Sequence, residues 1–324
     1  MSAVEYLNAQ QIKDLLPWSD LINAIDHIFV KEVVEPVRHH HSINVPNDPQ
    51  ATLLLMPVWI EGEYLGVKQV AVFPGNSQRG KPGLNGSYLL SSALTGEPLL
   101  QFDADELTAR RTAAASALAS RYLSRTDSHK LLMIGSGRLA RALVDAHCAV
   151  RPIDQIVVWS RNQSSAEKLV DSLVAEGKPA KVCTNSELAV STSTADIISC
   201  ATMATQPIIL GEWVQSGTHL DLVGAFRPDM RETDDAVIQK SSVFVDTRAG
   251  ALVEAGDLTQ AIQSGAFDKE NVVAEFTELS SKQHSGRNQL KDSEQQITLF
   301  KSVGAAREDL AAAMLAYQRL TNQK

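Results

Sequence analysis

The stretch Lys130-Leu-Leu-Met-Ile-Gly-Ser-Gly-Arg-Leu-Ala140 decides the fold of most of this 324-residue chain. Its apolar part, Leu131 to Ile134, is typical of a buried parallel strand, and residues 139–149 continue as a helix. Gly135 allows a tight turn, Gly137 lets the backbone approach an anion, and the final alanine lets helix and strand pack closely. This is the Gly-x-Gly-x-x-Ala form of the dinucleotide fingerprint, in which a pyrophosphate lies on the helix N-terminus.

The context of this fingerprint supports it, because a single match could also be an ordinary glycine turn. A second apolar strand, Gln155-Ile-Val-Val-Trp159, follows at the spacing of a βαβ unit. A carboxylate about 20 residues beyond the glycines usually binds the ribose 2′-hydroxyl. That place reads Ser160-Arg161-Asn162 here, and a guanidinium attracts a 2′-phosphate that a carboxylate would repel. We therefore expect NADPH as the preferred cofactor and NADH as the weaker one, unless Arg161 is only a solvated residue at a helix start.

The composition excludes several classes of protein. Lys and Arg total 30 against 38 Asp and Glu. This net charge of −8 does not indicate a positively charged surface for nucleic acid or an anionic membrane. We expect no signal peptide and no membrane span, because a basic leader and a run of 18 apolar residues are both lacking. Three widely spaced cysteines, Cys148, Cys183 and Cys200, favour reduced thiols in a cytoplasmic protein. The length favours two domains.

The two parts of the chain differ in pattern. Residues 10–30 have helical periodicity, and strand-like runs separated by turn signals follow. We expect these strands at 37–45, 51–60, 64–73 and 87–93, and we expect them to form an antiparallel module. An Ala-rich helix at 103–123 follows the module. From residue 130 strands and helices alternate. The strands expected there are 131–134, 156–159, 181–183, 197–201, 219–223, 242–245 and 272–274, with a polar loop at 280–293 and a last helix near 305–320.

Three cations of the first part could carry chemistry: Arg38, Lys68 and Arg111. Lys68 lies between apolar runs, so it could face inward from a strand, where it would need an anionic partner or a lowered pKa. Arg111 opens an Ala-rich stretch that permits close approach of other backbones. From spacing alone, a surface position is the alternative for each. The run His39-His-His41 invites a metal interpretation. Adjacent residues of a strand face opposite sides, so at most His39 and His41 could share a site, and no acidic or cysteine ligand accompanies them, so we predict no metal site.

With these residues in hand, the chain resembles the ornithine cyclodeaminase/μ-crystallin family over nearly its whole length. The segments that carry the likeness are Glu35-Pro-Val-Arg38, Leu107-Thr-Ala-Arg-Arg-Thr-Ala-Ala114, Ile134-Gly-Ser-Gly137 and His219-Leu-Asp-Leu-Val-Gly-Ala-Phe-Arg-Pro-Asp-Met-Arg-Glu232, with Lys301-Ser-Val-Gly304 similar to the closing motif of the family. The resemblance implies a homodimer in which an N-terminal module and the C-terminal segment bind a small amino or imino acid. A Rossmann domain would present the nicotinamide to it.

The resemblance also implies an α/β fold class and particular domains. We expect a doubly wound Rossmann-type domain at 118–296 and an α+β substrate-binding and dimerisation domain made of 1–117 and 297–324. Arg38 and Arg111 would clamp the substrate carboxylate, with Lys68 beside them and Ser87 as a further substrate contact. Lys68 is the candidate catalytic proton donor, an ordered water being the alternative. The residues assigned to the cofactor are Gly135, Ser136, Gly137, Arg138, Leu139, Ser160, Arg161, Asn162, Ala201, Thr202, Val223, Gly224, Ser302 and Gly304.

One departure from the family pattern narrows the expected activity. Cyclodeaminases and the similar alanine dehydrogenases have an aspartate two residues after the glycine of the Val-Gly motif, where this chain has Phe226. A phenyl ring cannot handle an amine as a carboxylate does. The run from Arg227 to Glu232 resembles instead the ketimine reductase branch. We therefore expect NAD(P)H-dependent reduction of cyclic ketimines, Δ1-pyrroline-2-carboxylate to L-proline and Δ1-piperideine-2-carboxylate to L-pipecolate. The alternatives are an ornithine cyclodeaminase or NAD-dependent amino-acid dehydrogenase, and a non-catalytic μ-crystallin-like binding protein.

Overall fold

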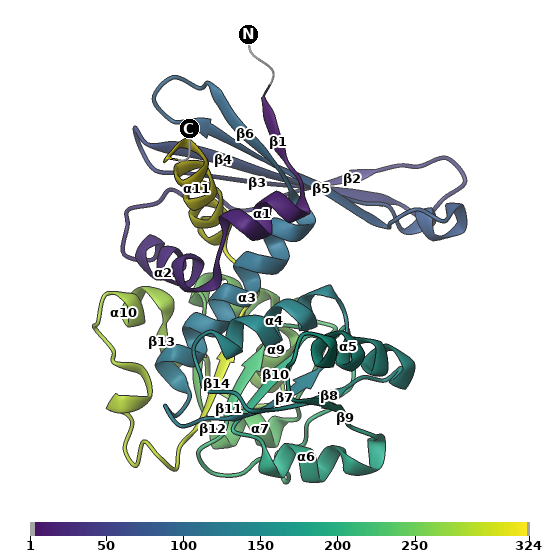
Figure 1. The fold of residues 1–324 in the computed structure, drawn as a ribbon, viewed down its shortest axis with the longest axis vertical. Helices are drawn as coiled ribbons and strands as arrows, with labels where there is room; N and C mark the ends of the chain where they lie inside the picture. Colours follow the sequence, from purple (N-terminus) through teal and green to yellow (C-terminus); the bar gives the residue numbers. More distant parts are fainter. Residues whose placement is uncertain (1–3, 323–324) are drawn as a thin grey trace. The chain divides into compact units, whose positions relative to one another are not determined.

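The computed structural model describes residues 4–322, which form two compact units (Figure 1). Unit 1 contains residues up to 112 and those from 306 onward, and unit 2 contains residues 113–305. The expected boundary at 296/297 differs from this division. Residues 297–301 form a strand that pairs on both sides with strands of unit 2, so they cannot belong to the first sheet.

A six-stranded sheet forms the body of unit 1. Its strands are β1 (Glu5–Leu7), β2 (His39–Ile43), β3 (Ala51–Trp59), β4 (Tyr64–Val72), β5 (Leu84–Ser92) and β6 (Pro98–Asp103), in the order β1-β6-β5-β4-β3-β2. β2 to β6 are antiparallel neighbours, as the alternating runs predict, but β1 pairs parallel to β6 and makes the sheet mixed. The sequence analysis missed β1, which is too short to show a period, and β6.

Helices accompany this sheet, and they include α1 (Ala9–Leu15), α2 (Trp18–Ile28), the first half of α3 (Ala104–Leu123) and α11 (Ala306–Asn322). A single helix was expected over 10–30. Pro17 divides it, because proline has no N–H for the helical ladder and constrains the residue before it. α11 packs on α2 and on the middle strands of the sheet, and it buries nearly all of its side chains from Glu308 to Ala316.

Unit 2 is built on an eight-stranded parallel sheet. Its strands are β7 (Lys130–Ile134), β8 (Gln155–Trp159), β9 (Ala180–Val182), β10 (Ile197–Cys200), β11 (His219–Leu222), β12 (Ser241–Val245), β13 (Val272–Glu275) and β14 (Ile297–Lys301), in the order β13-β12-β14-β11-β10-β7-β8-β9. β8, the next strand along the chain, lies on one side of β7 in the sheet, and β10 lies on the other side. The strand order therefore reverses at β7, which marks the topological switch point. The doubly wound α/β class is confirmed.

The connections of unit 2 are mostly helical. They are α4 (Arg138–Cys148), α5 (Gln163–Ala175), α6 (Leu188–Thr194), α7 (Asp235–Lys240), α8 (Arg248–Glu254), α9 (Gly256–Gln263) and α10 (Phe276–Ser280). α5 and α6 lie on opposite sides of the β8–β9 edge (Figure 1). The inner strands β10, β11 and β14 are buried along their whole length, because helices cover both faces. Among the described residues, no helix is long and apolar enough to cross a membrane.

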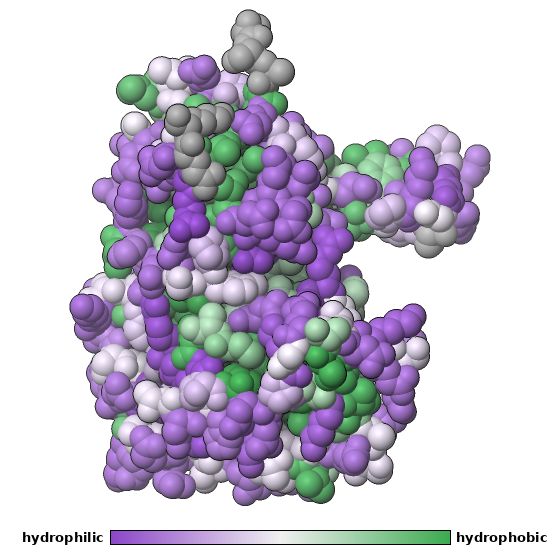
Figure 2. All heavy atoms as spheres, in the orientation of Figure 1, coloured by the Kyte–Doolittle hydropathy of each residue, from purple (hydrophilic) through white to green (hydrophobic). Residues whose placement is uncertain are grey.

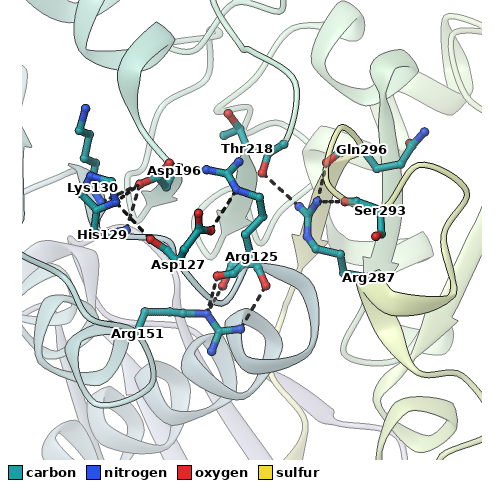
Figure 3. A network of polar contacts seen from close by, with 12 residues as sticks. Arg125, Asp127, His129, Lys130, Arg151, Asp196, Thr218, Arg287, Ser293 and Gln296 are labelled. Carbon is teal, nitrogen blue, oxygen red and sulfur yellow. Dashed lines mark hydrogen bonds and ion pairs between the residues drawn. The ribbon is translucent and has the colours of Figure 1, made fainter.

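Two arginines, Arg151 and Arg287, donate to carbonyl oxygens at the C-terminal end of α3 within unit 2 (Figure 3). Arg287, which is only 3% exposed, donates to the Leu123 carbonyl and to Thr298 Oγ1. Arg151 donates to the carbonyl oxygens of Ser120 and Arg125 at 2.9 and 2.8 Å. The last carbonyls of a helix have no helical donor, and cations are favourable there. The polar segment 280–293, expected as a loop, therefore contributes a buried structural residue.

Candidate functional site

Lys68 is a buried cation in the middle of β4. The register places it opposite Met56 and Tyr88, on the side of the sheet that α11 covers. Its Nζ lies 3.1 Å from Oδ1 of Asp309, and only 4% of the residue is exposed. Burial lowers the pKa of Lys68 to about 8, against the opposing charge of Asp309. Lys68 thus keeps its proton at neutral pH but can release it without strong base.

Arg111 joins the same group from α3. Its Nη1 lies 2.6 Å from Oε2 of Glu308 and its Nε lies 3.1 Å from Oδ1 of Asp309. Burial would lower the pKa of Arg111, but the two carboxylates outweigh it and hold that pKa above its ordinary value. The pKa of Asp309 is lowered, because the charges of Arg111 and Lys68 exceed the effect of its burial.

The sequence analysis missed Glu308 and Asp309. The available signal was a pair of acidic residues in an otherwise apolar, Ala-rich helix directly after Lys301-Ser-Val-Gly304. Both side chains are about 1% exposed. Charged residues are almost never buried in this way without partners. An acidic pair inside an apolar helix therefore predicts cations facing it.

Glu35 positions the segment that carries Arg38. Its carboxylate accepts from the backbone N–H groups of Ala306 and Arg307, at the start of α11, and from Nε of Arg307 at 2.8 Å. A helix N-terminus has free N–H groups that favour an anion. The Glu35-Pro-Val-Arg38 motif is therefore fastened to the helix that carries Asp309. Arg38 is half-buried and close enough to lower the pKa of Lys68.

The structure does not bring Ser87 to this group. Ser87 pairs with Gln69, whereas Lys68 pairs with Tyr88, so the two-residue period puts Ser87 on the opposite face of the sheet from Lys68. Tyr88 takes its place: it is fully buried, and its Oη has no hydrogen-bond partner among the described residues. Burial and the charge of Asp309 raise the pKa of Tyr88 well above its ordinary value, so it stays neutral.

These residues form what we call the cation cluster: Arg38, Lys68, Arg111, Glu308 and Asp309. Three of these residues are cations and two are carboxylates, so the five together carry one net positive charge when every group is ionised. An excess charge that is partly buried is costly unless a counter-ion balances it. The cluster is therefore suited to one monoanionic group, and a planar guanidinium suits a carboxylate in particular.

A cavity of about 550 Å³ lies at the carboxyl ends of β7, β8 and β10 in unit 2. It is lined by Gly135, Ser136, Gly137, Trp159, Ser160, Arg161, Asn162 and residues 201–208. Gly135 has φ +118°, and a Cβ there would lie 2.7 Å from the Ala201 carbonyl oxygen. Only glycine fits this turn. α4 begins directly after Gly137, so its free N–H groups are available to a phosphate. The cradle fits a dinucleotide.

No described residue that lines the ribose end of this cavity is acidic. Ser160 accepts a hydrogen bond from Ser136 at 3.0 Å, and Arg161 and Asn162 are exposed at the end of β8. None of the residues that line the cavity is acidic. A 2′-phosphate would meet a cation there and no negative charge.

The structure gathers some of the expected cofactor residues and not others. The cavity is lined by Gly135, Ser136, Gly137, Ser160, Arg161, Asn162, Ala201 and Thr202, but not by Arg138, Leu139, Val223, Gly224, Ser302 or Gly304. The first two begin α4, and the others follow β11 and β14. Sequence analysis missed Trp159 and the segment 203–208. The segment follows the carboxyl end of β10, beside the switch point, and this position could have indicated that it binds the cofactor.

The loop after β11 carries Phe226 where the cyclodeaminase pattern has an aspartate. Phe226 is 44% exposed, so it is not a core residue. Ala225 before it adopts a positive φ of +49°. The carboxylate nearest to this position in sequence, Asp229, is exposed and paired with Arg227 at 2.9 Å. This loop therefore offers no carboxylate in the place of the expected aspartate.

The His run and the cysteines show no metal arrangement. His39 and His41 lie on one side of β2, with ring centroids 6.3 Å apart, and both are exposed. In the part of the chain that the structure describes, no group of three or more His, Cys, Asp or Glu is placed to hold a metal ion.

The switch-point cavity and the parallel sheet define a dinucleotide-binding α/β protein, and the separate cation cluster is typical of a site for a small anion. The model of the ornithine cyclodeaminase/mu-crystallin family matches residues 5–324, and the chain belongs to this family.

Similar proteins cover the chain almost completely. A protein of Schizosaccharomyces pombe of uncharacterised function is 51% identical, over 97% of both chains. The Delta(1)-pyrroline-2-carboxylate reductase of Paracoccus denitrificans is 37% identical, over 96% of both. The structure of the Thermococcus litoralis Delta(1)-pyrroline-2-carboxylate reductase with NADH and L-proline has a TM-score of 0.88 and 32% identity, covering 99% of this chain and 98% of that one. An archaeal alanine dehydrogenase dimer with bound NAD has a TM-score of 0.86 and 27% identity, covering 99% and 97%.

Proposed function

We propose that this protein reduces cyclic ketimines with a nicotinamide cofactor, converting Δ1-pyrroline-2-carboxylate to L-proline and Δ1-piperideine-2-carboxylate to L-pipecolate. The observation that carries the proposal is the single net positive charge of the cation cluster in unit 1. These substrates carry one carboxylate next to the imine carbon. The names of relatives such as the Paracoccus reductase support the same activity.

The chain's own residues have distinct parts in this reaction. Arg38 and Arg111 bind the substrate carboxylate and orient the neighbouring carbon. When bound in unit 2, the reduced cofactor supplies a hydride to that carbon. Lys68 holds a proton at Nζ, because its pKa of about 8 keeps it protonated at neutral pH. A protonated imine nitrogen is the better hydride acceptor, and Lys68 is the group that maintains that state, so that one hydride and one proton complete the amine.

We propose NADPH as the preferred cofactor. Arg161 at the end of β8 and the lack of an acidic residue along the cavity support this preference. NADH remains the weaker alternative, and the Thermococcus neighbour was solved with NADH. The ratio of kcat/KM for the two cofactors measures the preference directly.

Phe226 opposes the cyclodeaminase and amino-acid dehydrogenase alternatives, since its ring replaces the carboxylate those enzymes have. A single pair of assays separates the readings. We expect oxidation of NADPH on addition of Δ1-pyrroline-2-carboxylate, and no ammonia from L-ornithine. Ammonia and proline from ornithine, without imine reduction, would establish a cyclodeaminase. Neither reaction, with cofactor bound, would establish the non-catalytic binding protein.

We also propose a homodimer formed through the sheet of unit 1. The half-buried run Leu53 to Leu55 of β3 and the 47%-exposed Leu84 of β5 leave apolar surface on the ends of these strands (Figure 2). Such a surface is unusual on a monomer. The alanine dehydrogenase neighbour is a dimer. A sedimenting mass of one chain at micromolar concentration would contradict this proposal. The free thiols of Cys148, Cys183 and Cys200 support a reducing compartment, the cytoplasm.

A further inference from the structure

Glu232 is a fully buried carboxyl that holds one wall of the cofactor cavity. Its Oε1 accepts from the backbone N–H of Thr202 at 2.7 Å and from the Thr202 hydroxyl at 2.8 Å. The Thr202 oxygen in turn accepts from the N–H of Ala204 at 3.2 Å. Thr202 and Ala204 both line the cavity. One carboxyl oxygen therefore sets the conformation with which the segment 201–208 leaves β10.

The backbone beside Glu232 is fastened to the same segment. The N–H of Ile208 donates to the Glu232 carbonyl at 2.8 Å, and the N–H of Arg231 donates to the Ala204 carbonyl at 2.7 Å. Gly224 gives the carboxyl its space, because a Cβ there would lie 2.4 Å from Oε1 of Glu232. Both ends of the segment thus depend on the position of one residue.

A second buried carboxyl lies beside the first. Asp257 is also fully buried, and its Oδ1 accepts from the N–H of Glu232 at 2.9 Å and from the N–H and hydroxyl of Thr233 at 2.9 and 3.1 Å. The remaining oxygens, Oε2 of Glu232 and Oδ2 of Asp257, are both buried without a hydrogen-bond partner among the described residues. Two buried acceptors without a donor are unfavourable, and one proton held between these two carboxyl groups would remove the conflict.

The other charged and titratable groups around this pair are consistent with one proton bound by the two carboxyl groups. Lys301 on β14 is fully buried and donates to the carbonyl oxygen of Leu222 at 3.0 Å and to that of Gly224. Its single charge also faces Asp246, so it cannot balance two ionised carboxyl groups in the pair. Burial keeps Cys200 on β10 a thiol. Two further buried carboxylates have partners of their own: Asp246 faces Lys301 and accepts from the N–H groups of Val303 and Gly304, and Asp221 faces Cys200 and contacts His147.

We propose that Glu232 is a positioning residue for the nicotinamide cofactor, and that Glu232 and Asp257 share one proton that keeps the Thr202 segment in its binding conformation. The proton resides on Oε2 of Glu232 and is donated to Asp257, while Oε1 holds Thr202. Burial and the charge of Asp257 raise the pKa of Glu232 to about 8, whereas Lys301 and the Thr202 bonds oppose that rise. Loss of the proton places two like charges side by side and loosens the segment. The inference rests on the cofactor site proposed above.

The test is the dissociation constant of NADH between pH 7 and 9.5, measured by the fluorescence of the bound cofactor without substrate. NADH has no 2′-phosphate to titrate. We expect binding by the unmodified protein to weaken roughly tenfold over this range, the change that a one-unit pKa shift on binding produces. In Glu232→Gln the amide oxygen still accepts from Thr202 and the amide N–H donates to Asp257. The affinity of Glu232→Gln for NADH should therefore equal that of the unmodified protein at pH 7, and it should stay constant from pH 7 to 9.5.

Glu167→Gln is the matched control, because Glu167 is exposed on α5 and its visible partner is the neighbouring Gln163 side chain. It should keep the pH dependence of the unmodified protein. An identical pH profile in Glu232→Gln would overturn the shared proton. No NADH binding by the unmodified protein at any pH would instead overturn the cofactor site itself, so the two failures are distinguishable.

A second pair of variants tests the positioning role if Glu232→Gln folds poorly. Thr202→Val removes the hydroxyl that links Glu232 to Ala204, and Thr202→Ser retains it. We expect the valine variant to raise the KM for cofactor at least roughly fivefold, the effect of one lost hydrogen bond, with the imine KM unchanged. The serine variant should restore the cofactor KM. Equal cofactor KM values in both variants would contradict the role of this link.

Discussion

The side chains of Lys68 and Asp309 meet with Nζ 3.1 Å from Oδ1, although 241 residues separate them in the chain. The contact ties the middle of β4 to the first turns of α11 and sets the electrostatics of the cation cluster. Asp309 opposes the fall that burial causes in the pKa of Lys68. Its charge therefore decides over which pH range Lys68 holds a proton.

Asp309→Asn should shift the pH profile of imine reduction. Removal of the carboxylate charge lowers the pKa of Lys68 below about 8, so Lys68 loses its proton at lower pH. The alkaline decline of kcat/KM for Δ1-pyrroline-2-carboxylate should then begin at lower pH. The control is Glu63→Gln, which changes an exposed partner of Lys31 in the same unit. An unchanged alkaline decline in Asp309→Asn would exclude Lys68 as the proton holder.

Arg38→Met should impair imine reduction and spare cofactor binding. Arg38 is only half-buried, so the variant leaves intact the buried ion pairs of Arg111 with Glu308 and Asp309. We expect kcat/KM for the imine to fall at least roughly a hundredfold, about 2.7 kcal/mol of transition-state stabilisation. The NADPH dissociation constant should not change. Lys31→Met, at an exposed cation, is the control, and a similar loss in both variants would contradict the carboxylate clamp.

Residues 160 and 161 should control the choice of cofactor. Arg161→Ala should raise the KM for NADPH roughly ten- to a hundredfold, through the loss of a charged hydrogen bond, and leave that for NADH unchanged. Ser160→Asp should add the carboxylate that repels a 2′-phosphate and make NADH the better cofactor. Lys168→Ala removes an exposed cation of α5 as a control. If Arg161→Ala weakened both cofactors equally, the predicted preference would be wrong.

Arg287→Met should destabilise unit 2 without changing the chemistry. It leaves the carbonyl oxygens of Ser293 and Gln296 without their Arg287 donor, in the network of Figure 3. Each unsatisfied buried acceptor costs about 1–3 kcal/mol, so the free energy of unfolding should fall by several kcal/mol. Chemical denaturation measures the fall, and KM values of the folded variant should stay normal. Arg227→Met, which breaks an exposed ion pair, should change the unfolding free energy by less than about 1 kcal/mol.

The sequence could predict what depends on neighbours along the chain. The fingerprint turn, the strand that ends at Trp159 and the inward Lys68 each follow from a local pattern and a two- or 3.6-residue period. Contacts between distant segments could not be predicted in this way. Asp309 is matched to Lys68 only by the packing of α11 on the sheet, and Arg287 lies in a run whose polarity is typical of a solvent-exposed loop. Ser87 lies on the face of the sheet opposite Lys68, and this face depends on a strand register that the sequence does not specify.

The buried pair at Glu232 should make the stability of the protein depend on pH. The pKa of Glu232 is about 8 in the folded protein and lies near 4.5 in the unfolded chain. The folded state therefore holds a proton that the unfolded state releases between these values, so the contribution of Glu232 to the free energy of unfolding falls as pH rises from about 4.5 to about 8. Glu232→Gln removes this dependence. The measurement is the free energy of unfolding in urea at pH 5.5 and 7.5 for the unmodified protein, Glu232→Gln and the control Glu167→Gln. Relative to the unmodified protein, Glu232→Gln should be more stable at pH 7.5 than at pH 5.5, whereas Glu167→Gln should show no such change. An equal difference at both pH values would show that Glu232 is ionised in the folded protein.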